Sequence, residues 1–277
     1  MHLHPAVVHV ARPPGDADLV RAALSESAVA DALHPPGDEE SPRRHVFLEY
    51  YVLTLNPDLA LLFDLDGVII DSMPLHTLAW ERYLERNGID PANIEARMHG
   101  KRNDELVRDL FGNHLSAAEI FEHGAAKERL FREMMGEALD PRLVPGIREF
   151  LREASASAAI GLGTNAEPAN VDFVLNGAGV RQYFRAIVDG FQVKRAKPAP
   201  DVYLRGAELL GVAPADCIVF EDSPVGIRAA RAAGMRVVGL LTHAASLADV
   251  DAAVPDFRDP ELRRWLSAQS ATSNSSR

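Results

Sequence analysis

The sequence predicts an α/β fold in which a doubly wound parallel sheet carries an inserted all-helical cap. From Val144 onward, short apolar runs alternate with amphipathic segments, a pattern typical of parallel strands joined by right-handed helical crossovers with helices on both faces. Before that point, residues 73–141 carry apolar positions at helical spacing without a convincing strand. We therefore expect a core formed by residues 58–72 and 142–266 and a helical cap formed by residues 73–141.

The composition is ordinary for a globular protein, with 277 residues of which 47% are hydrophobic and 25% charged. The 29 basic and 40 acidic residues give a formal net charge of −11, which argues against nucleic acid or an anionic membrane surface as the main partner. The single cysteine, Cys217, excludes a disulfide framework and a cysteine-based zinc cluster. With no apolar run of ~18 residues and no secretory pattern at the N-terminus, we expect a cytoplasmic protein that is a monomer or a weak homo-oligomer.

The two ends of the chain differ from the rest. Residues 1–57 scatter prolines among Ala, His and Asp without sustained periodicity, so we expect a mobile extension with one short helix near residues 18–33. The Ser/Thr-rich residues 267–277 are expected to be a frayed tail.

The first strand of the core is expected within Leu61–Leu65, where two aspartates, Asp64 and Asp66, interrupt an apolar run. A spacing of two on a strand predicts that both carboxylates lie on one face. Unpaired buried carboxylates are costly, so the pair implies a counter-cation or a site at the wet end of the strand. Gly67 follows and allows a turn or the close approach of a ligand.

The remaining elements are predicted from apolar periodicity and from turn and cap residues. Asp71 or Ser72 can cap a helix that ends at Asn87-Gly88. Further cap helices are expected over 103–111 and 116–136. In the core we expect strands at 158–162, 186–189, 217–220, 236–241 and 252–254, and helices at 146–156, 167–178, 200–210, 224–233 and 260–267.

A second acidic pair, Glu221 and Asp222, closes the strand that begins at Cys217, as the first pair closes its own strand. Ligands bind beyond the carboxyl ends of parallel strands, so four carboxylates are expected to converge there and to need a cation. With oxygen ligands and no nearby cysteine or histidine set, Mg²⁺ is the best candidate.

Two other strand ends supply groups that can bind phosphate. Thr164 and Asn165 offer a hydroxyl, an amide and backbone N–H groups at the start of a helix. Lys197 stands at the entry of the next helix, where its charge favours an anion. His76, on the first cap helix close to the acids, is expected to pack there or to contact substrate or Asp66.

A dinucleotide-binding alternative arises because residues 161–166 satisfy G-x-G-x-x-A between a strand and a helix. That motif expects an acidic residue ~20 positions further on, whereas Asp189 lies 26 residues beyond Gly163. A dinucleotide site would also leave both acidic pairs unexplained. A non-catalytic binding module is a second alternative, which the intact set of acids and Lys197 argues against.

Taken in order, Asp64-Leu65-Asp66, Thr164, Lys197-Pro198 and Glu221-Asp222 resemble the four motifs of the haloacid dehalogenase superfamily, and the helical insert resembles the cap of its β-phosphoglucomutase-like phosphatases. The resemblance implies a Rossmann-like core with a mobile cap. It also implies that Asp64 is the nucleophile that forms an aspartyl-phosphate.

The same resemblance assigns the other site residues. Asp66 acts as general acid and then as general base. Nearby Asp64 and apolar surroundings are expected to raise its pKa, while the metal opposes this rise and cap closure sets the balance. Mg²⁺ is held by Asp64, the Asp66 backbone carbonyl and Asp222, with Glu221 nearby. Thr164 and Lys197 hold phosphoryl oxygens.

The chain departs from the mutases at two places. The cap loop contains Lys101-Arg102-Asn103. The mutases resemble one another in having an arginine at the position that Asn103 occupies here. Ala166-Glu167 replaces a Ser-Lys pair. Because a mutase must hold a bisphosphate at both ends, these changes favour a Mg²⁺-dependent phosphatase of small phosphorylated metabolites, with sugar phosphates foremost. A sugar phosphomutase is the alternative, in which Lys101 or Arg102 substitutes for the missing cation.

Overall fold

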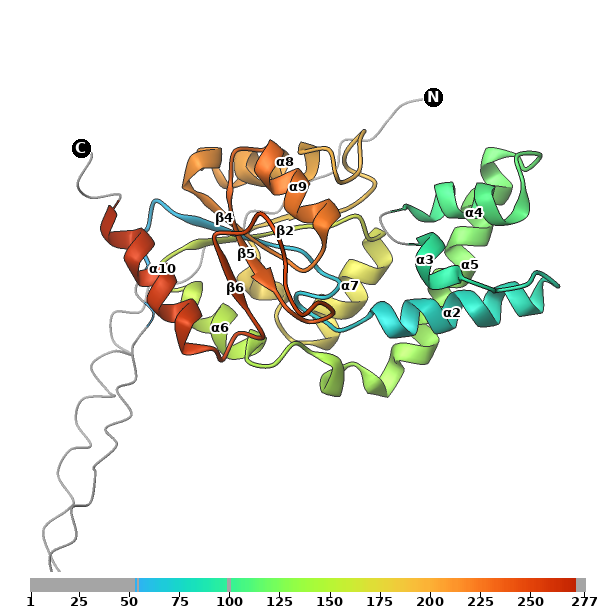
Figure 1. The fold of residues 1–277 in the computed structure, drawn as a ribbon, viewed down its shortest axis with the longest axis horizontal. Helices are drawn as coiled ribbons and strands as arrows, with labels where there is room; N and C mark the ends of the chain where they lie inside the picture. Colours follow the sequence, from blue (N-terminus) through green and yellow to red (C-terminus); the bar gives the residue numbers. More distant parts are fainter. Residues whose placement is uncertain (1–52, 54, 99–100, 273–277) are drawn as a thin grey trace, which may run out of the picture. The chain divides into compact units, whose positions relative to one another are not determined.

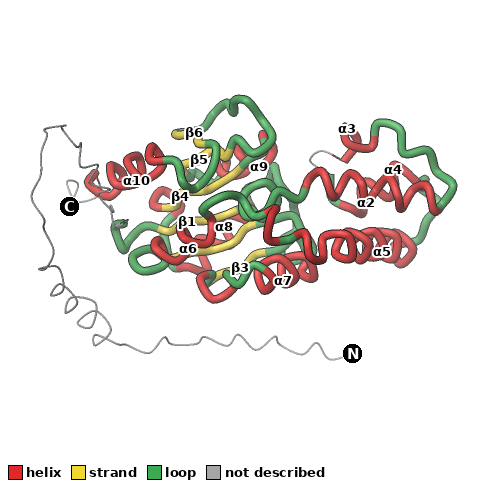
Figure 2. Tube along the Cα trace, turned by 90° about the horizontal axis from the view of Figure 1, so that it is seen from below, coloured by secondary structure: helices red, strands yellow, loops and turns green. Residues whose placement is uncertain are grey.

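The sheet matches the predicted fold class. A computed structural model of the protein describes residue 53 and residues 55–98 and 101–272. Within these residues, six parallel strands form one sheet in the order β3-β2-β1-β4-β5-β6 (Figure 1 and Figure 2). The strands are β1 Ala60–Phe63, β2 Ala159–Gly163, β3 Ala186–Val188, β4 Cys217–Glu221, β5 Arg236–Leu240 and β6 Ala252–Val254. This is the strand order of a doubly wound Rossmann-like sheet.

The helices lie close to their predicted positions. The α-helices are α2 Met73–Arg86, α3 Ile94–Met98, α4 Asn103–Phe111, α5 Ala117–Met135, α6 Ile147–Ala154, α7 Pro168–Gly177, α8 Asp201–Leu210, α9 Pro224–Ala232 and α10 Pro260–Thr272. Short 3₁₀ turns are η1 Gly136–Ala138, η2 Asp140–Arg142, η3 Arg181–Tyr183 and η4 Pro214–Asp216. Helix α3 was not predicted, and α10 continues past Ser267. The helix expected near residues 18–33 lies outside the described residues.

The two faces of the sheet bury different side chains because successive residues of a strand point to opposite faces. From β1, Leu61 and Phe63 pack into a cluster with residues of α6, α7 and α10. Leu62 joins a second cluster with residues of α8 and α9. Helices therefore cover both faces, as the doubly wound class requires.

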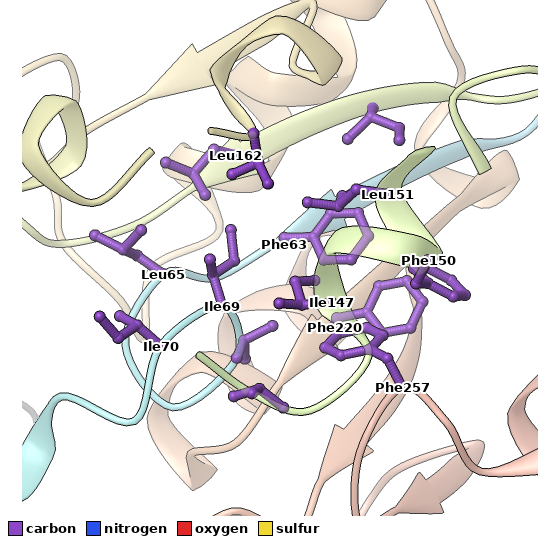
Figure 3. Packing of buried hydrophobic residues seen from close by; sticks show 14 of the residues in the cluster. Phe63, Leu65, Ile69, Ile70, Ile147, Phe150, Leu151, Leu162, Phe220 and Phe257 are labelled. Atoms are coloured by element: carbon purple, nitrogen blue, oxygen red, sulfur yellow. The ribbon is translucent and has the colours of Figure 1, made fainter. Parts of the chain in front are cut away.

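Aromatic rings pack against one another within the first cluster (Figure 3). Phe63 and Phe220, from neighbouring strands, stack with ring centroids 4.6 Å apart. Phe150 of α6 meets Phe257 at 5.0 Å. These large buried rings make the ends of β1 and β4 a rigid support for the loops that follow.

Helices α2 to α5 lie between β1 and α6 in the chain and gather apart from the sheet (Figure 1). They have their own buried cluster, which includes Trp80, Leu84 and Leu106. The predicted end of α2 is confirmed: the helix ends before Asn87, and Gly88 has a φ of 70°. Ser116 caps the start of α5.

The start of the described chain belongs to the core. Leu53 and Leu55, which the sequence placed in the N-terminal extension, are both buried in the first cluster. The Leu55 backbone N–H also donates a hydrogen bond to Ser157 Oγ at 3.1 Å. The core therefore begins before residue 58.

Candidate active site

The site lies at the carboxyl edge of the sheet, where β1 and β4 are neighbours. Phe63 and Phe220 stand opposite each other in the register, so Asp64 emerges beside Glu221 and Asp222. The Asp64 backbone N–H donates to the Phe220 carbonyl at 3.0 Å and fixes this pairing. Strands distant in sequence thus bring two acidic segments together. Of the four carboxylates expected to converge, three form one cluster and Asp66 is not part of it.

Three carboxylates form the acidic cluster. Asp64, Glu221 and Asp222 each offer an oxygen, and these oxygens lie within 4.8 Å of one another. Burial, with the charges of Glu221 and Asp64, raises the pKa of Asp222 to about 9. Burial also raises the pKa of Asp64 to about 7, although Lys197 opposes the shift. A cation between these oxygens would stabilise their ionised forms.

Gly67 allows the cluster to be this compact. It has a φ of 75°, a conformation that glycine adopts without steric cost. A Cβ on Gly67 would overlap the Asp222 carboxylate. The Gly67 carbonyl accepts a hydrogen bond from Thr242 Oγ1 at 2.6 Å, which holds the loop against the segment that follows β5.

Glu221 is fully buried, and both of its oxygens already accept hydrogen bonds. Oε1 accepts from Lys197 Nζ at 2.7 Å and from Tyr203 Oη at 2.6 Å. Oε2 accepts from the backbone N–H groups of Asp222 and Ser223. With these donors in place, Glu221 holds Lys197 and the Asp222 backbone in position; its predicted role as a direct metal ligand stays a prediction.

Lys197 is the buried cation of the site. Its Nζ lies 3.0 Å from Asp64 Oδ1 and 4.8 Å from the centre of the Tyr203 ring. Burial lowers its pKa, but the charges of Asp64 and Glu221 outweigh that effect and raise the pKa above its usual value. Lys197 therefore stays charged. Tyr203 gave no functional signal in the sequence, where it is one apolar position of a helix.

The groups expected to bind phosphate lie beside this cluster. Thr164 is buried, and its Oγ1 accepts from the Ala166 backbone N–H at 3.1 Å, which leaves the hydroxyl hydrogen able to donate. Asn165 Oδ1 accepts from the Lys197 backbone N–H at 3.2 Å and ties the two loops together.

Asp66 does not share a strand face with Asp64, because β1 ends at Phe63 and both acids lie in the following loop. A turn closed by the Gly67 N–H and the Ile70 carbonyl at 2.8 Å redirects the chain. Asp66 Oδ1 instead accepts from Ser72 Oγ at 2.5 Å and lies 3.5 Å from His76 Nε2. Ser72 makes no side-chain cap for α2, contrary to one of the two expectations for that helix.

The expectation that surroundings raise the pKa of Asp66 is also wrong. Burial does raise it, but hydrogen bonds from His76 and Ser72, together with the His76 charge, outweigh burial and lower the pKa below its usual value. Asp66 is therefore ionised in this arrangement. The partners that decide this come from the start of α2, not from Asp64.

A buried polar network behind His76 was missed by sequence reasoning. Lys127 Nζ lies 2.8 Å from His76 Nδ1 and 2.8 Å from Glu128 Oε1. Asn170 of α7 donates to Glu128 Oε2 at 2.7 Å. Lys127 lies in the buried stripe of α5, at helical spacing from Phe131, so a charged residue at an apolar position was the available signal.

The cap-loop residues have partners of their own. Asn103 Nδ2 donates to Glu128 Oε1 at 2.6 Å. Lys101 pairs closely with Asp109, and Arg102 Nε lies 3.6 Å from Asp104. Their predicted roles in substrate binding stay predictions.

The glycines of the dinucleotide-like motif have a packing explanation. A Cβ on Gly161 would come within 2.7 Å of Leu62 Cδ2, and a Cβ on Gly163 within 3.0 Å of Tyr203. Both glycines lie within β2, where they let α8 approach the sheet. The motif therefore does not require a bound dinucleotide.

The residues of the cluster fit a hard divalent cation. Asp64 and Asp222 offer carboxylate oxygens as ligands, and the absence of a side chain at Gly67 lets the Asp222 carboxylate reach this position. A hard cation such as Mg²⁺ prefers such carboxylate ligands. The structure carries an acidic cluster suited to a divalent metal.

Fold and site together define a class of protein. A Rossmann-like sheet presents, at the carboxyl end of its first strand, an aspartate held by a buried lysine and flanked by acids from the neighbouring strand. This arrangement is suited to phosphoryl transfer, in which positioning and charge neutralisation do most of the work.

Comparison with known proteins agrees with this class. Residues 59–234 match the model of the haloacid dehalogenase-like hydrolases, and the chain belongs to this family. Among similar proteins, the fructose-1-phosphate phosphatase YqaB of Escherichia coli (strain K12) is 35% identical over 182 residues, which cover 64% of this chain and 94% of that protein. The β-phosphoglucomutase of Bacillus subtilis (strain 168) is 33% identical over 187 residues, 65% of this chain and 82% of that protein.

The three-dimensional structure is also similar to solved structures of such proteins. A crystal structure of β-phosphoglucomutase from Clostridium difficile superimposes with a TM-score of 0.66 at 27% identity, covering 77% of this chain and 98% of that one. Among the described residues, no helix is long and apolar enough to cross a membrane.

Proposed function

We propose that this protein is a Mg²⁺-dependent phosphatase of small phosphorylated metabolites, foremost sugar phosphates, and that it acts through a phosphorylated Asp64. The observation that carries the proposal is the environment of Asp64. Its Oδ1 is held by Lys197 at 3.0 Å and by the Leu65 backbone N–H at 2.8 Å. None of the described residues donates a hydrogen bond to Oδ2, which is therefore available to attack phosphorus.

Lys197 and Thr164 are positioned to bind the phosphoryl group. Lys197 is charged and buried beside the attacking carboxylate, so it can neutralise oxygen charge on the transferring group. The Thr164 hydroxyl and backbone N–H groups of the following loop can donate to the remaining oxygens. A Mg²⁺ ion held by Asp64, Asp222 and the Asp66 carbonyl would supply further neutralisation of phosphoryl charge.

Asp66 is the proposed proton carrier. Its ionised state beside His76 and Ser72 suits the second step, in which it takes a proton from water that attacks the phospho-aspartate. In the first step it must donate a proton to the leaving oxygen. His76 Nε2 lies 3.5 Å from Asp66 Oδ1 and holds this carboxyl group in place for both steps.

A sugar phosphomutase is the second candidate, because β-phosphoglucomutases are among the similar proteins. Asn103 and Glu167 favour hydrolysis. Asn103 donates a hydrogen bond to Glu128 at 2.6 Å, and Glu167 accepts one from Arg132 at 2.6 Å. Neither side chain is a cation, so neither position offers an unpaired positive charge to a second phosphate.

We further propose a cytoplasmic location from the single cysteine, a monomer or weak homo-oligomer, and a cap bounded near residues 73 and 141. Cap motion about Ser72 and residues 141–146 would admit substrate and then exclude water.

A screen of phosphorylated metabolites with and without Mg²⁺ tests the function. We expect phosphate release from sugar monophosphates that requires the ion. In a second assay, β-glucose 1-phosphate is supplied with catalytic glucose 1,6-bisphosphate, and free phosphate should accumulate. Dominant formation of glucose 6-phosphate would instead establish the mutase.

A further inference from the structure

A pocket of about 270 Å³ opens between the helical cap and the core next to the site. Its cap side includes Asn103 and Phe121, and its core side includes Asn165, Glu167 and Phe191. Asn165 connects the pocket to the reaction centre through its hydrogen bond to the Lys197 backbone. The part of a substrate that extends away from a phosphoryl group at Asp64 therefore has this pocket available to it.

The cations behind the inner wall of the pocket are already neutralised. Arg132 Nη1 donates to Glu167 Oε1 and to Asn170 Oδ1, both at 2.6 Å. Lys127 Nζ donates to Glu128 Oε1 at 2.8 Å, and Glu128 is only 3% exposed. Each of these two cations is thus matched by one carboxylate.

The carboxylates also lie where an entering anion would approach. Glu167 lines the pocket, and Glu128 lies directly behind Asn103, which also lines it. Asn170 joins the two acids, since it donates to Glu128 and accepts from the arginine that holds Glu167. Of the two ion pairs, only the carboxylate of Glu167 lines the pocket, while Arg132 and Lys127 do not, so a second phosphate at this wall would approach a carboxylate before either cation.

We propose that Glu167 and Glu128 make this pocket selective for an uncharged, hydroxylated leaving group, so that the protein hydrolyses monophosphates of polyhydroxy compounds and discriminates against bisphosphates. This inference rests on the proposed phosphatase function. Glu167 is a specificity residue that faces the leaving group, and Glu128 acts through Asn103.

The pocket offers what a neutral sugar or sugar alcohol needs. Among the described residues, none donates a hydrogen bond to Glu167 Oε2, which can therefore accept one from a substrate hydroxyl. Asn103 and Asn165 add amide groups to the same wall. Phe121 and Phe191 are 57% and 56% exposed and present apolar ring faces to the carbon skeleton.

Two arginines that also line the pocket provide the competing possibility. Arg102 and Arg108 both line it, and they share Asp104 at 3.6 Å and 2.8 Å. If these arginines held a second phosphate, bisphosphates would be good substrates of the wild-type protein. The experiment below separates the two cases.

The test compares kcat/KM for phosphate release from fructose 1-phosphate and from fructose 1,6-bisphosphate. The wild type should prefer the monophosphate by at least ~10-fold. Glu167→Gln should reduce that preference ~10-fold, since it removes the charge that repels the second phosphate and leaves the Arg132 charge without a carboxylate partner. The change should appear mainly in the KM for the bisphosphate. Glu128→Gln should act in the same direction, and Glu167→Asp should keep most of the preference.

Glu133→Gln is the matched control, because Glu133 is an exposed glutamate on α5, the helix that also carries Glu128. It should leave the preference unchanged. Thermal unfolding of every variant verifies folding, and Glu167→Gln keeps the test valid if the buried Glu128→Gln variant does not fold.

Equal wild-type efficiency on both substrates, or an unchanged preference in folded Glu167→Gln, would overturn the inference. Either result leaves the phosphatase proposal standing, since phosphate is still released from the monophosphate. Absence of phosphate release from any compound of the metabolite screen would instead refute the proposed function itself.

Discussion

At the scale of single residues, Lys197 and Glu221 act together as a buried support for the nucleophile. Glu221 accepts hydrogen bonds from Lys197 and Tyr203, and Lys197 in turn holds Asp64. Removing one member of such a set leaves an uncompensated buried charge, which costs far more than the pair contributes. The acid that the sequence assigned to metal binding therefore also fixes the lysine beside the reacting carboxylate.

Gly67 gives a prediction at the same scale. Gly67→Ala should destabilise the protein and lower activity by ~10²-fold, because the new methyl group must displace Asp222 and small displacements of reacting groups have effects of this size. Chemical denaturation and steady-state kinetics measure the two effects.

Gly234→Ala separates strain from displacement. Gly234 has a φ of 77°, close to the 75° of Gly67, but nothing lies within 4 Å of its Cβ position. It should lose about 1 kcal/mol of stability and keep its activity. Equal activity losses in both variants would mean that contact with Asp222 is not the reason for glycine at position 67.

At the scale of elements, the sequence was most informative where short apolar runs and caps coincide. Alternating apolar runs located every core strand to within two residues of its observed ends, and Ser116 correctly marked the start of α5. The end of β1 was misjudged because Leu65 continues the apolar run, although it is buried in a loop and not in the strand. Hydrophobic periodicity alone cannot distinguish a residue buried in a strand from one buried in a loop.

The features of the site can likewise be separated into those that the sequence predicted and those that it did not. The proximity of Asp64 and the Glu221-Asp222 pair was predictable because they lie at the carboxyl ends of strands of one parallel sheet, and Lys197 was predictable because it precedes the next helix at the same edge. The Asp66 environment was not, since it depends on how α2 and α5 pack and on Lys127, a charged residue in an apolar stripe. Contacts between helices of the cap and the loop after β1 have no local sequence signature.

The capping box of α5 gives a prediction for this element. Ser116 Oγ accepts from the Glu119 backbone N–H, and Glu119 Oε2 accepts from the Ser116 backbone N–H at 2.8 Å. Ser116→Ala should lower helix stability by about 1 kcal/mol and accelerate amide exchange in the first turn of α5. Exchange in β1 and β4 should be unchanged, and Ser116→Thr should behave like wild type. Faster exchange throughout the core in Ser116→Ala would contradict this local role.

At the scale of the whole molecule, the buried network around Glu128 connects the cap with α7 of the core. Burial raises the pKa of Glu128, but the charges of Lys127 and His76 and the hydrogen bond from Asn103 outweigh burial and lower it from 4.5 to about 2. Because the folded protein holds this carboxylate in its ionised form, Glu128 stabilises the fold fully above pH 4.5 and loses that contribution as the pH falls toward 2.

The prediction is that Glu128→Gln lowers the free energy of unfolding by about 3 kcal/mol near neutral pH and that this difference shrinks as the pH falls below 4.5. Urea unfolding of both proteins across this range measures it, with Glu133→Gln as the exposed control. A difference that stays constant down to strongly acidic pH would show that the loss comes from packing and not from charge.

The central claim is that Asp64 receives the phosphoryl group. The direct measurement is a single turnover with acetyl phosphate and Mg²⁺, quenched in acid and followed by peptide mapping, with Asp66→Asn included to slow breakdown of the intermediate. We expect one phosphoryl group on the peptide that contains Asp64 and none in Asp64→Asn, which should fold normally. Phosphate attached to another residue, or complete turnover by Asp64→Asn, would contradict the account.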